Sequence, residues 1–203
     1  MSAFLGPIHY WLYNKIQIQQ SIVNKIIEAG EETIPELREY LNTKYGKSET
    51  RPLEDVIDQS NIHGWLQEQV SREEFKLAES ITLLLKKKNE ILNEIKDIFQ
   101  IAGKSIFRTI TIENVSNAYK AISNSLLDGM PCDHANSVIE ENEERIVWKR
   151  NSCVHQKYWN EVNGDITVYY ILRDEFIKGS LDNTVYLYKK TGTDSYEIRR
   201  NLK

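Results

Sequence analysis

The chain has 203 residues, 40% of them hydrophobic, and a formal net charge of −4. A chain of this length can bury one substantial core or two small ones without disulfide bonds. Its 26 basic residues are outnumbered by 30 acidic ones and form no long basic tract. Nucleic-acid binding, which requires a basic stripe, is therefore not expected.

No stretch of the sequence approaches the roughly 20 apolar residues that a membrane-spanning helix needs. The start of the chain also lacks the charged and then apolar pattern of a secretion signal. We therefore expect a soluble, cytoplasmic protein with no membrane partner. In that reducing compartment Cys132 and Cys153 are expected as thiols or ligands, not as a disulfide.

Residues 1–128 are predicted to form a bundle of four or five helices. Gly6 and Pro7 are suited to a helix start, and Ser60 is the expected N-cap of the longest helix, which either continues through lysines 86–88 or pauses there. Each predicted helix has one apolar stripe, and such stripes can be buried only against one another. Helical spacing of apolar residues is found at 7–28, 35–44, 60–99 and 113–127.

Residues 129–203 are predicted to form a small α+β domain packed on the bundle. The sequence Thr-Gly-Thr-Asp at 191–194 is typical of a hairpin turn, and the apolar run at 166–176 fits either a strand or a helix. The expected fold class is therefore α+β, with a helical bundle followed by a small antiparallel sheet and one or two helices. Strands are expected at 144–149, 184–189 and 195–199, and a short helix at 158–162.

All four histidines and both cysteines belong to two kinds of short motif, each of which occurs twice. Residues 8–12 (IHYWL) match residues 62–66 (IHGWL) at four of five positions. Residues 132–134 (CDH) match residues 153–155 (CVH) at the first and last position. Matching patterns among residues this rare suggest that they serve a common site.

The first motif places His9 and His63 in the first turn of two long predicted helices. The positive end of the helix dipole favours a neutral imidazole, which is the form that binds a metal. We predict that both histidines face one cavity and bind a cofactor, with Trp11 and Trp65 as its walls. The alternative is that the tryptophans anchor the core and each histidine is a boundary residue.

The second motif fits a metal site if both copies are extended, because residues i and i+2 of an extended segment point to the same face. Cys132, His134, Cys153 and His155 are accordingly predicted as ligands of zinc or, less often, iron. Pro131 before the first copy permits the extended geometry. Non-covalent haem also fits, because histidine and cysteine are both axial ligands of haem.

Two further interpretations use the same part of the chain without a metal. In one, Cys153 or Cys132 is a nucleophile and His134 is a candidate base, so whether the protein is an enzyme stays open. In the other, the protein is a metal-free small-molecule-binding or sensor protein, in which the helical part makes the cavity and the aromatic-rich C-terminal part closes it. The aromatic residues that could line a ligand pocket are Tyr158, Trp159, Tyr169 and Tyr170. The long helical stretch at 60–99 also permits a homodimer.

Overall fold

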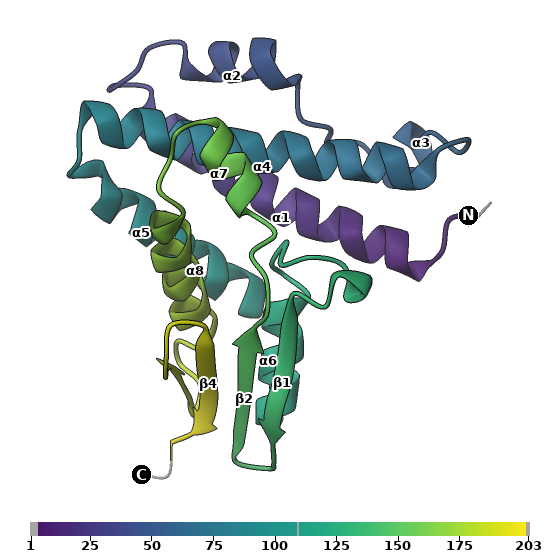
Figure 1. Cartoon of the computed structure of the whole chain (residues 1–203), viewed down its shortest axis with the longest axis vertical. Coiled ribbons are helices and arrows are strands. Elements are labelled where there is room, and N and C mark those ends of the chain that lie inside the picture. Colours follow the sequence, from purple (N-terminus) through teal and green to yellow (C-terminus); the bar gives the residue numbers. More distant parts are fainter. Residues whose placement is uncertain (1–3, 109, 202–203) are drawn as a thin grey trace. The chain divides into compact units, whose positions relative to one another are not determined.

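A computed structural model describes residues 4–108 and 110–201 (Figure 1). The contacts within the chain divide it into two compact units, each built from two segments. Unit 1 comprises Met1–Leu92 and His155–Ile166, and unit 2 comprises Asn93–Val154 and Thr167–Lys203. Unit 1 is helical, whereas unit 2 combines helices with a sheet.

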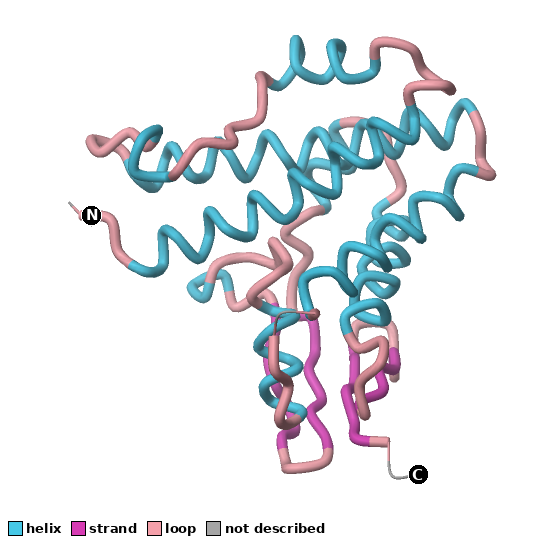
Figure 2. The backbone as a smooth tube through the Cα atoms, turned by 180° about the vertical axis from the view of Figure 1, so that it is seen from behind, coloured by secondary structure: helices cyan, strands magenta, loops and turns pink. Residues whose placement is uncertain are grey.

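In unit 1 the long helices α1 and α4 lie side by side, as both views show (Figures 1 and 2). The shorter helices α2 and α7 both pack on α4. The predicted packing of amphipathic helices is thus confirmed for this part of the chain. The helices of unit 1 are α1 (Pro7–Gly30), α2 (Leu37–Tyr45), α3 (Leu53–Val56), α4 (Ile62–Lys87) and α7 (Gln156–Glu161).

Helix α1 begins where the sequence predicts it. Gly6 is extended (φ −118°, ψ 172°) and Pro7, whose ring presets a helical φ, is the first helical residue. The helix ends at Gly30, where a Cβ atom would lie 2.6 Å from Cδ2 of Leu84. Glycine at this position therefore allows α1 to approach α4 closely. The apolar stripe of α1 is buried and includes Leu12, Ile16, Val23, Ile26 and Ile27.

Helix α4 differs from the prediction at its start, and at its end it follows one of the two alternatives that the sequence left open. Its N-cap is Asn61, not Ser60, because the Asn61 side chain accepts a hydrogen bond from the backbone N–H of Gly64 at 3.2 Å. The helix pauses after Lys87, where Lys88 adopts an extended conformation (φ −148°, ψ 99°). The predicted stripe at 60–99 is therefore divided between α4 and α5 (Ile91–Phe107).

Unit 2 contains a four-stranded antiparallel sheet with the strand order β1-β2-β4-β3. The predicted hairpin around 191–194 is confirmed as the β3–β4 pair, in which Tyr188 lies opposite Ile198. Together with unit 1 this sheet confirms the α+β class. The elements of unit 2 are α5, α6 (Val115–Ser123), the 3-10 turn Pro131–Asp133, β1 (Asn136–Glu141), β2 (Arg145–Arg150), α8 (Ile166–Ser180), β3 (Tyr186–Lys190) and β4 (Ser195–Arg200).

Aromatic rings form the core of unit 2 around Trp148 of β2, which is 1% exposed. Tyr196 of β4 stacks on it with ring centroids 5.5 Å apart, and Tyr119 of α6 contacts it at 5.1 Å. Helix α6 therefore packs on β2 and β4. Such large rings supply much of the apolar area that a small sheet can bury.

The structure also shows where local patterns are insufficient. Residues 166–176, which fit a strand or a helix, belong to α8. Strand β1 is absent from the predicted elements, because five of its six residues are exposed and show no alternation. The contact-based division differs from the predicted boundary at residue 128, since α6 packs on strands β2 and β4 and α7 packs on α4.

Across the described residues no helix combines the length and hydropathy that crossing a membrane requires.

Candidate functional site

The first turns of α1 and α4 bring the imidazoles of His9 and His63 together, although the residues are 54 positions apart. Their Nε2 atoms are 3.3 Å apart, and the ring planes are tilted by 49°. His9 is buried and only 4% exposed, whereas His63 is exposed. We call these two residues the imidazole pair. One of its rings is accessible from outside, and the other is held within the fold.

The backbone around Gly6 determines the protonation pattern of the imidazole pair. The Gly6 N–H donates a hydrogen bond to Nδ1 of His9 at 2.9 Å, so Nδ1 carries a lone pair. The proton of neutral His9 is therefore on Nε2, where it is donated to Nε2 of His63. Consequently the proton of neutral His63 is on Nδ1. His9, at the third position of α1, here takes the capping role that glutamate usually has.

Aromatic rings lie beside the imidazole pair on the same two helices. Trp65 of α4 contacts the ring of Tyr13 with centroids 6.0 Å apart. On α1, the ammonium of Lys15 lies 4.0 Å from the ring centroid of Trp11, an arrangement that stabilises a buried cation. Both tryptophans, predicted as cavity walls, are half-buried. They thus pack against neighbouring side chains of unit 1, and Lys15 is 1% exposed.

A second polar cluster links α1, α4 and the start of α7 in the interior of unit 1. The carboxylate of Glu74 accepts a hydrogen bond from Nε2 of Gln19 at 2.9 Å and lies 2.8 Å from Nδ1 of His155. All three side chains are less than 10% exposed. His155, which the sequence predicts as a metal ligand, is therefore bonded to a buried carboxylate and holds α7 on α4.

Gln19 and Glu74 are absent from the predicted site, although the sequence contains one indication. Gln19 occupies a stripe position of α1, between Ile16 and Val23, where an apolar residue is expected. A polar residue in such a position needs a buried partner. The partner itself, 55 positions further along the chain, has no local pattern that identifies it.

The Cys-x-His motifs are not extended, and this corrects the geometry expected for them. Pro131 starts a 3-10 turn, which a proline at the first position favours, and His134 after it is left-handed (φ 46°). In the second copy His155 is in the right-handed helical region as the N-cap of α7. Cysteine and histidine therefore do not share one face of a strand in either motif. Cys132 and His134 are both exposed.

The predicted ligands also belong to different units. Cys132, His134 and Cys153 lie in unit 2, and His155 lies in unit 1. Within residues 4–108 and 110–201, no group of three or more histidine, cysteine, aspartate and glutamate side chains has an arrangement that could hold a metal ion. The four-ligand centre stays a prediction without a ligand cluster to support it.

Cys153, the candidate nucleophile, is half-buried in the loop that follows β2. Burial raises the pKa of Tyr170, as does a hydrogen bond between its hydroxyl and the Cys153 thiol. The guanidinium of Arg150 lies 3.6 Å from the centre of the Tyr170 ring. The thiol of Cys153 is thus bonded to a tyrosine, and its role as a nucleophile stays a prediction.

Glu73 of α4 is a buried carboxyl group in unit 1. It is 1% exposed, and its Oε2 atom has no hydrogen-bond partner among the described residues. Burial raises the pKa of Glu73, against the lowering effects of a hydrogen bond with Ser48 and of the charges of Lys76 and Arg72. A carboxyl group whose pKa is raised by folding stabilises the fold at low pH, and this contribution is lost as the pH rises through the folded-state pKa.

Replacing Glu73 with glutamine is therefore expected to stabilise unit 1 near neutral pH, because the amide has no charge to desolvate. The gain should shrink as the pH is lowered, since Glu73 itself then becomes neutral. Urea unfolding at several pH values measures both effects. Glu68→Gln on the exposed side of α4 is the control and should change stability little. A destabilised Glu73→Gln at neutral pH would show that the attraction to Lys76 outweighs burial.

The chain was compared with protein-family models, with curated proteins and with solved structures. None of the three comparisons found a match.

Proposed function

We propose that the protein binds a divalent transition-metal ion through the Nε2 atoms of the imidazole pair. The observation that carries the proposal is their separation of 3.3 Å. Two ring nitrogens bound about 2.1 Å from one ion at a tetrahedral angle lie roughly 3.4 Å apart. An ion can therefore take the place of the proton that the two rings share, with little movement of either ring.

In the metal-free protein the hydrogen bond from Gly6 orients the ring of His9, and it also selects the tautomer that has its proton on Nε2. For an ion to bind Nε2, that proton has to move to Nδ1, where it displaces the hydrogen bond from Gly6. Losing that hydrogen bond costs about 0.5–1.5 kcal/mol.

Two protein ligands leave part of the coordination sphere of the ion open. Imidazole suits Zn²⁺, Cu²⁺ and Ni²⁺, and an open position allows the ion to bind water or a small molecule. The exposure of His63 gives such a molecule access. A metal-dependent interaction with a small ligand combines the metal-binding and small-molecule-binding functions that the sequence suggests. It uses His9 and His63, which are predicted as cofactor-binding residues, in place of the Cys-x-His motifs.

Titration of tag-free protein with Zn²⁺ and Cu²⁺ by calorimetry tests the proposal. His63→Gln is expected to weaken binding about tenfold or more, because one of two ligands is lost. His63 is exposed, so this variant should unfold at the wild-type urea concentration. His134→Gln is the matched control, since it removes another exposed histidine in unit 2, and it should bind as the wild type does. Cu²⁺ should bind more tightly than Zn²⁺.

A double variant, Cys132→Ser with Cys153→Ser, separates the imidazole pair from the Cys-x-His motifs. It is expected to keep the metal affinity of the wild type. Loss of binding in this variant, together with normal binding by His63→Gln, would overturn the proposal in favour of the Cys-x-His motifs. Wild-type protein that binds neither ion would contradict both sites. Titration of the same variants with haemin, followed by absorbance, tests non-covalent haem.

A further inference from the structure

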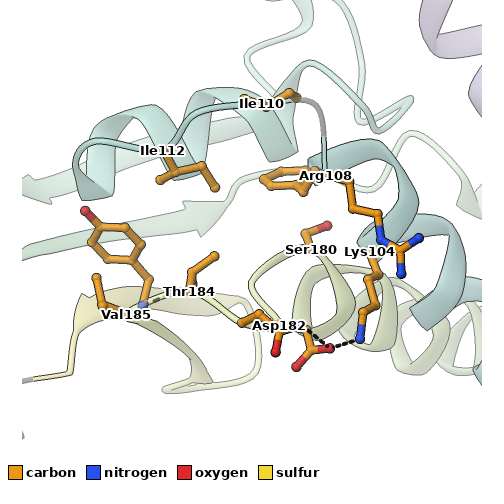
Figure 3. Close-up of a pocket in the computed structure, with 11 residues that line it drawn as sticks. Lys104, Arg108, Ile110, Ile112, Ser180, Asp182, Thr184 and Val185 are labelled. Carbon is orange, nitrogen blue, oxygen red and sulfur yellow. Dashed lines mark hydrogen bonds and ion pairs between the residues drawn. The ribbon is translucent and has the colours of Figure 1, made fainter.

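Unit 2 contains a cavity of about 590 Å³ where the end of α5 lies beside the segment that follows α8 (Figure 3). This volume is within the range of sites for small organic molecules. None of the histidines or cysteines contributes to it. The residues that line it are Lys104, Phe107, Arg108, Ile110, Ile112, Ser180, Asp182, Asn183, Thr184, Val185 and Tyr186.

Apolar side chains that are unusually exposed line part of this cavity. Val185 is 54% exposed and Ile110 is 40% exposed, and the rings of Phe107 and Tyr186 are largely buried beside them. Covering apolar surface contributes about 25 cal/mol for each Å² removed from water. A ligand with an apolar body would therefore be stabilised by contact with these side chains.

The charged side chains are at the other end of the cavity. Figure 3 shows Lys104, Arg108 and Asp182 at one end and Ile112, Thr184 and Val185 at the other. Lys104 forms an ion pair with Asp182. Arg108 has no ion pair or hydrogen bond with any residue that the structure describes, so this end has one positive charge in excess. A guanidinium without an ionic partner is suited to bind a carboxylate, to which it can donate two N–H groups.

From this polarity we infer that the cavity binds a small carboxylic acid with an apolar body. The carboxylate pairs with Arg108, and the hydrocarbon part covers Val185 and Ile112 at the other end. One end of the cavity is charged and the other is apolar, as are the two ends of such a molecule. The inference is independent of metal binding by the imidazole pair, because every residue that it uses belongs to unit 2.

Binding of octanoate, compared with uncharged octanol, tests the inference. Calorimetry in the presence of a chelator excludes any contribution from a metal ion. Octanoate should bind at least about tenfold more tightly than octanol, and Arg108→Gln should remove this preference while leaving octanol binding unchanged. Arg199→Gln, which replaces an exposed guanidinium of β4 outside the cavity, is the matched control and should behave as the wild type.

Val185→Asn tests the apolar end separately. Because Val185 is more than half exposed, the variant should keep its fold and lose affinity for octanoate and octanol alike. Equal octanoate affinity in Arg108→Gln and the wild type would overturn the inference. Competition by inorganic phosphate as effective as that by octanoate would also overturn it, because the cavity would then bind anions without using its apolar end.

Discussion

Gly179→Ala is expected to destabilise unit 2 by about 3 kcal/mol or more. Gly179 of α8 faces Gln100 of α5, and a Cβ atom at Gly179 would lie 2.0 Å from the carbonyl oxygen of Gln100. The contact is reciprocal, since a Cβ atom at Gly103 of α5 would lie 2.1 Å from the carbonyl oxygen of Phe176. Both obstacles are backbone atoms, which cannot rotate away as a side chain can. Helices α5 and α8 run side by side in both views (Figures 1 and 2).

Helix propensity alone predicts the opposite sign for this substitution. Alanine is favoured over glycine in a helix by about 1 kcal/mol. The steric overlap outweighs this gain, because no real Cβ atom approaches a backbone oxygen so closely. Urea unfolding measures the result. Gly192→Ala is the control, since its nearest neighbour would be 3.6 Å away and its stability should stay close to that of the wild type. A stable Gly179→Ala variant would contradict the close crossing of α5 and α8.

Asp128→Asn is expected to cost about 3–5 kcal/mol, because it leaves a buried guanidinium without its counter-ion. Arg173 of α8 is 3% exposed, and its Nε and Nη2 atoms donate to Oδ2 of Asp128 at 3.0 and 2.5 Å. Burial alone would lower the pKa of Arg173, but the attraction and hydrogen bonds of Asp128 raise it. The ring of Tyr196 lies 5.2 Å from the guanidinium and cannot replace the carboxylate.

Glu175→Gln on the same helix is the matched control for Asp128→Asn. Its partner Lys178 is exposed and Glu175 itself is half-buried, so loss of this ion pair should change the free energy of unfolding by only about 1 kcal/mol or less. The double variant Asp128→Asn with Arg173→Met should recover much of the stability, because both charges are then removed from the interior. If Asp128→Asn unfolds at the same urea concentration as the wild type, the guanidinium of Arg173 is stabilised by water or by another counter-ion.

Whether a structural feature could be predicted from the sequence depends on how far apart along the chain the interacting residues are. The start of α1 at Pro7 and the hairpin at 191–194 depend on neighbouring residues, and the structure confirms both. Residues 166–176 could not be assigned, because a continuous apolar run has the same appearance in a buried strand and a buried helix. Strand β1 has only exposed or half-buried positions and therefore lacks the alternation by which strands are found.

In the candidate sites, too, local features could be predicted from the sequence and contacts between distant residues could not. The IHYWL and IHGWL motifs identify His9 and His63 and place each in a first helical turn. The CDH and CVH motifs suggest a ligand set from spacing alone, but a 3-10 turn and a helix cap remove the extended geometry that the set requires. Arg108 is an ordinary surface arginine in the sequence, and only the folded chain shows that it borders a cavity without a partner.

From the amino-acid sequence alone it was possible to locate the long N-terminal helices, the hairpin turn and the repeated motifs, because each depends on residues a few positions apart. Three features became visible only in the folded chain: the approach of two imidazoles to 3.3 Å, the pairing of His155 with Glu74, and the crossing of α5 and α8 at their glycines. Those contacts join residues separated by 54 to 81 positions, and they form when buried faces pack together. No local pattern specifies the partner.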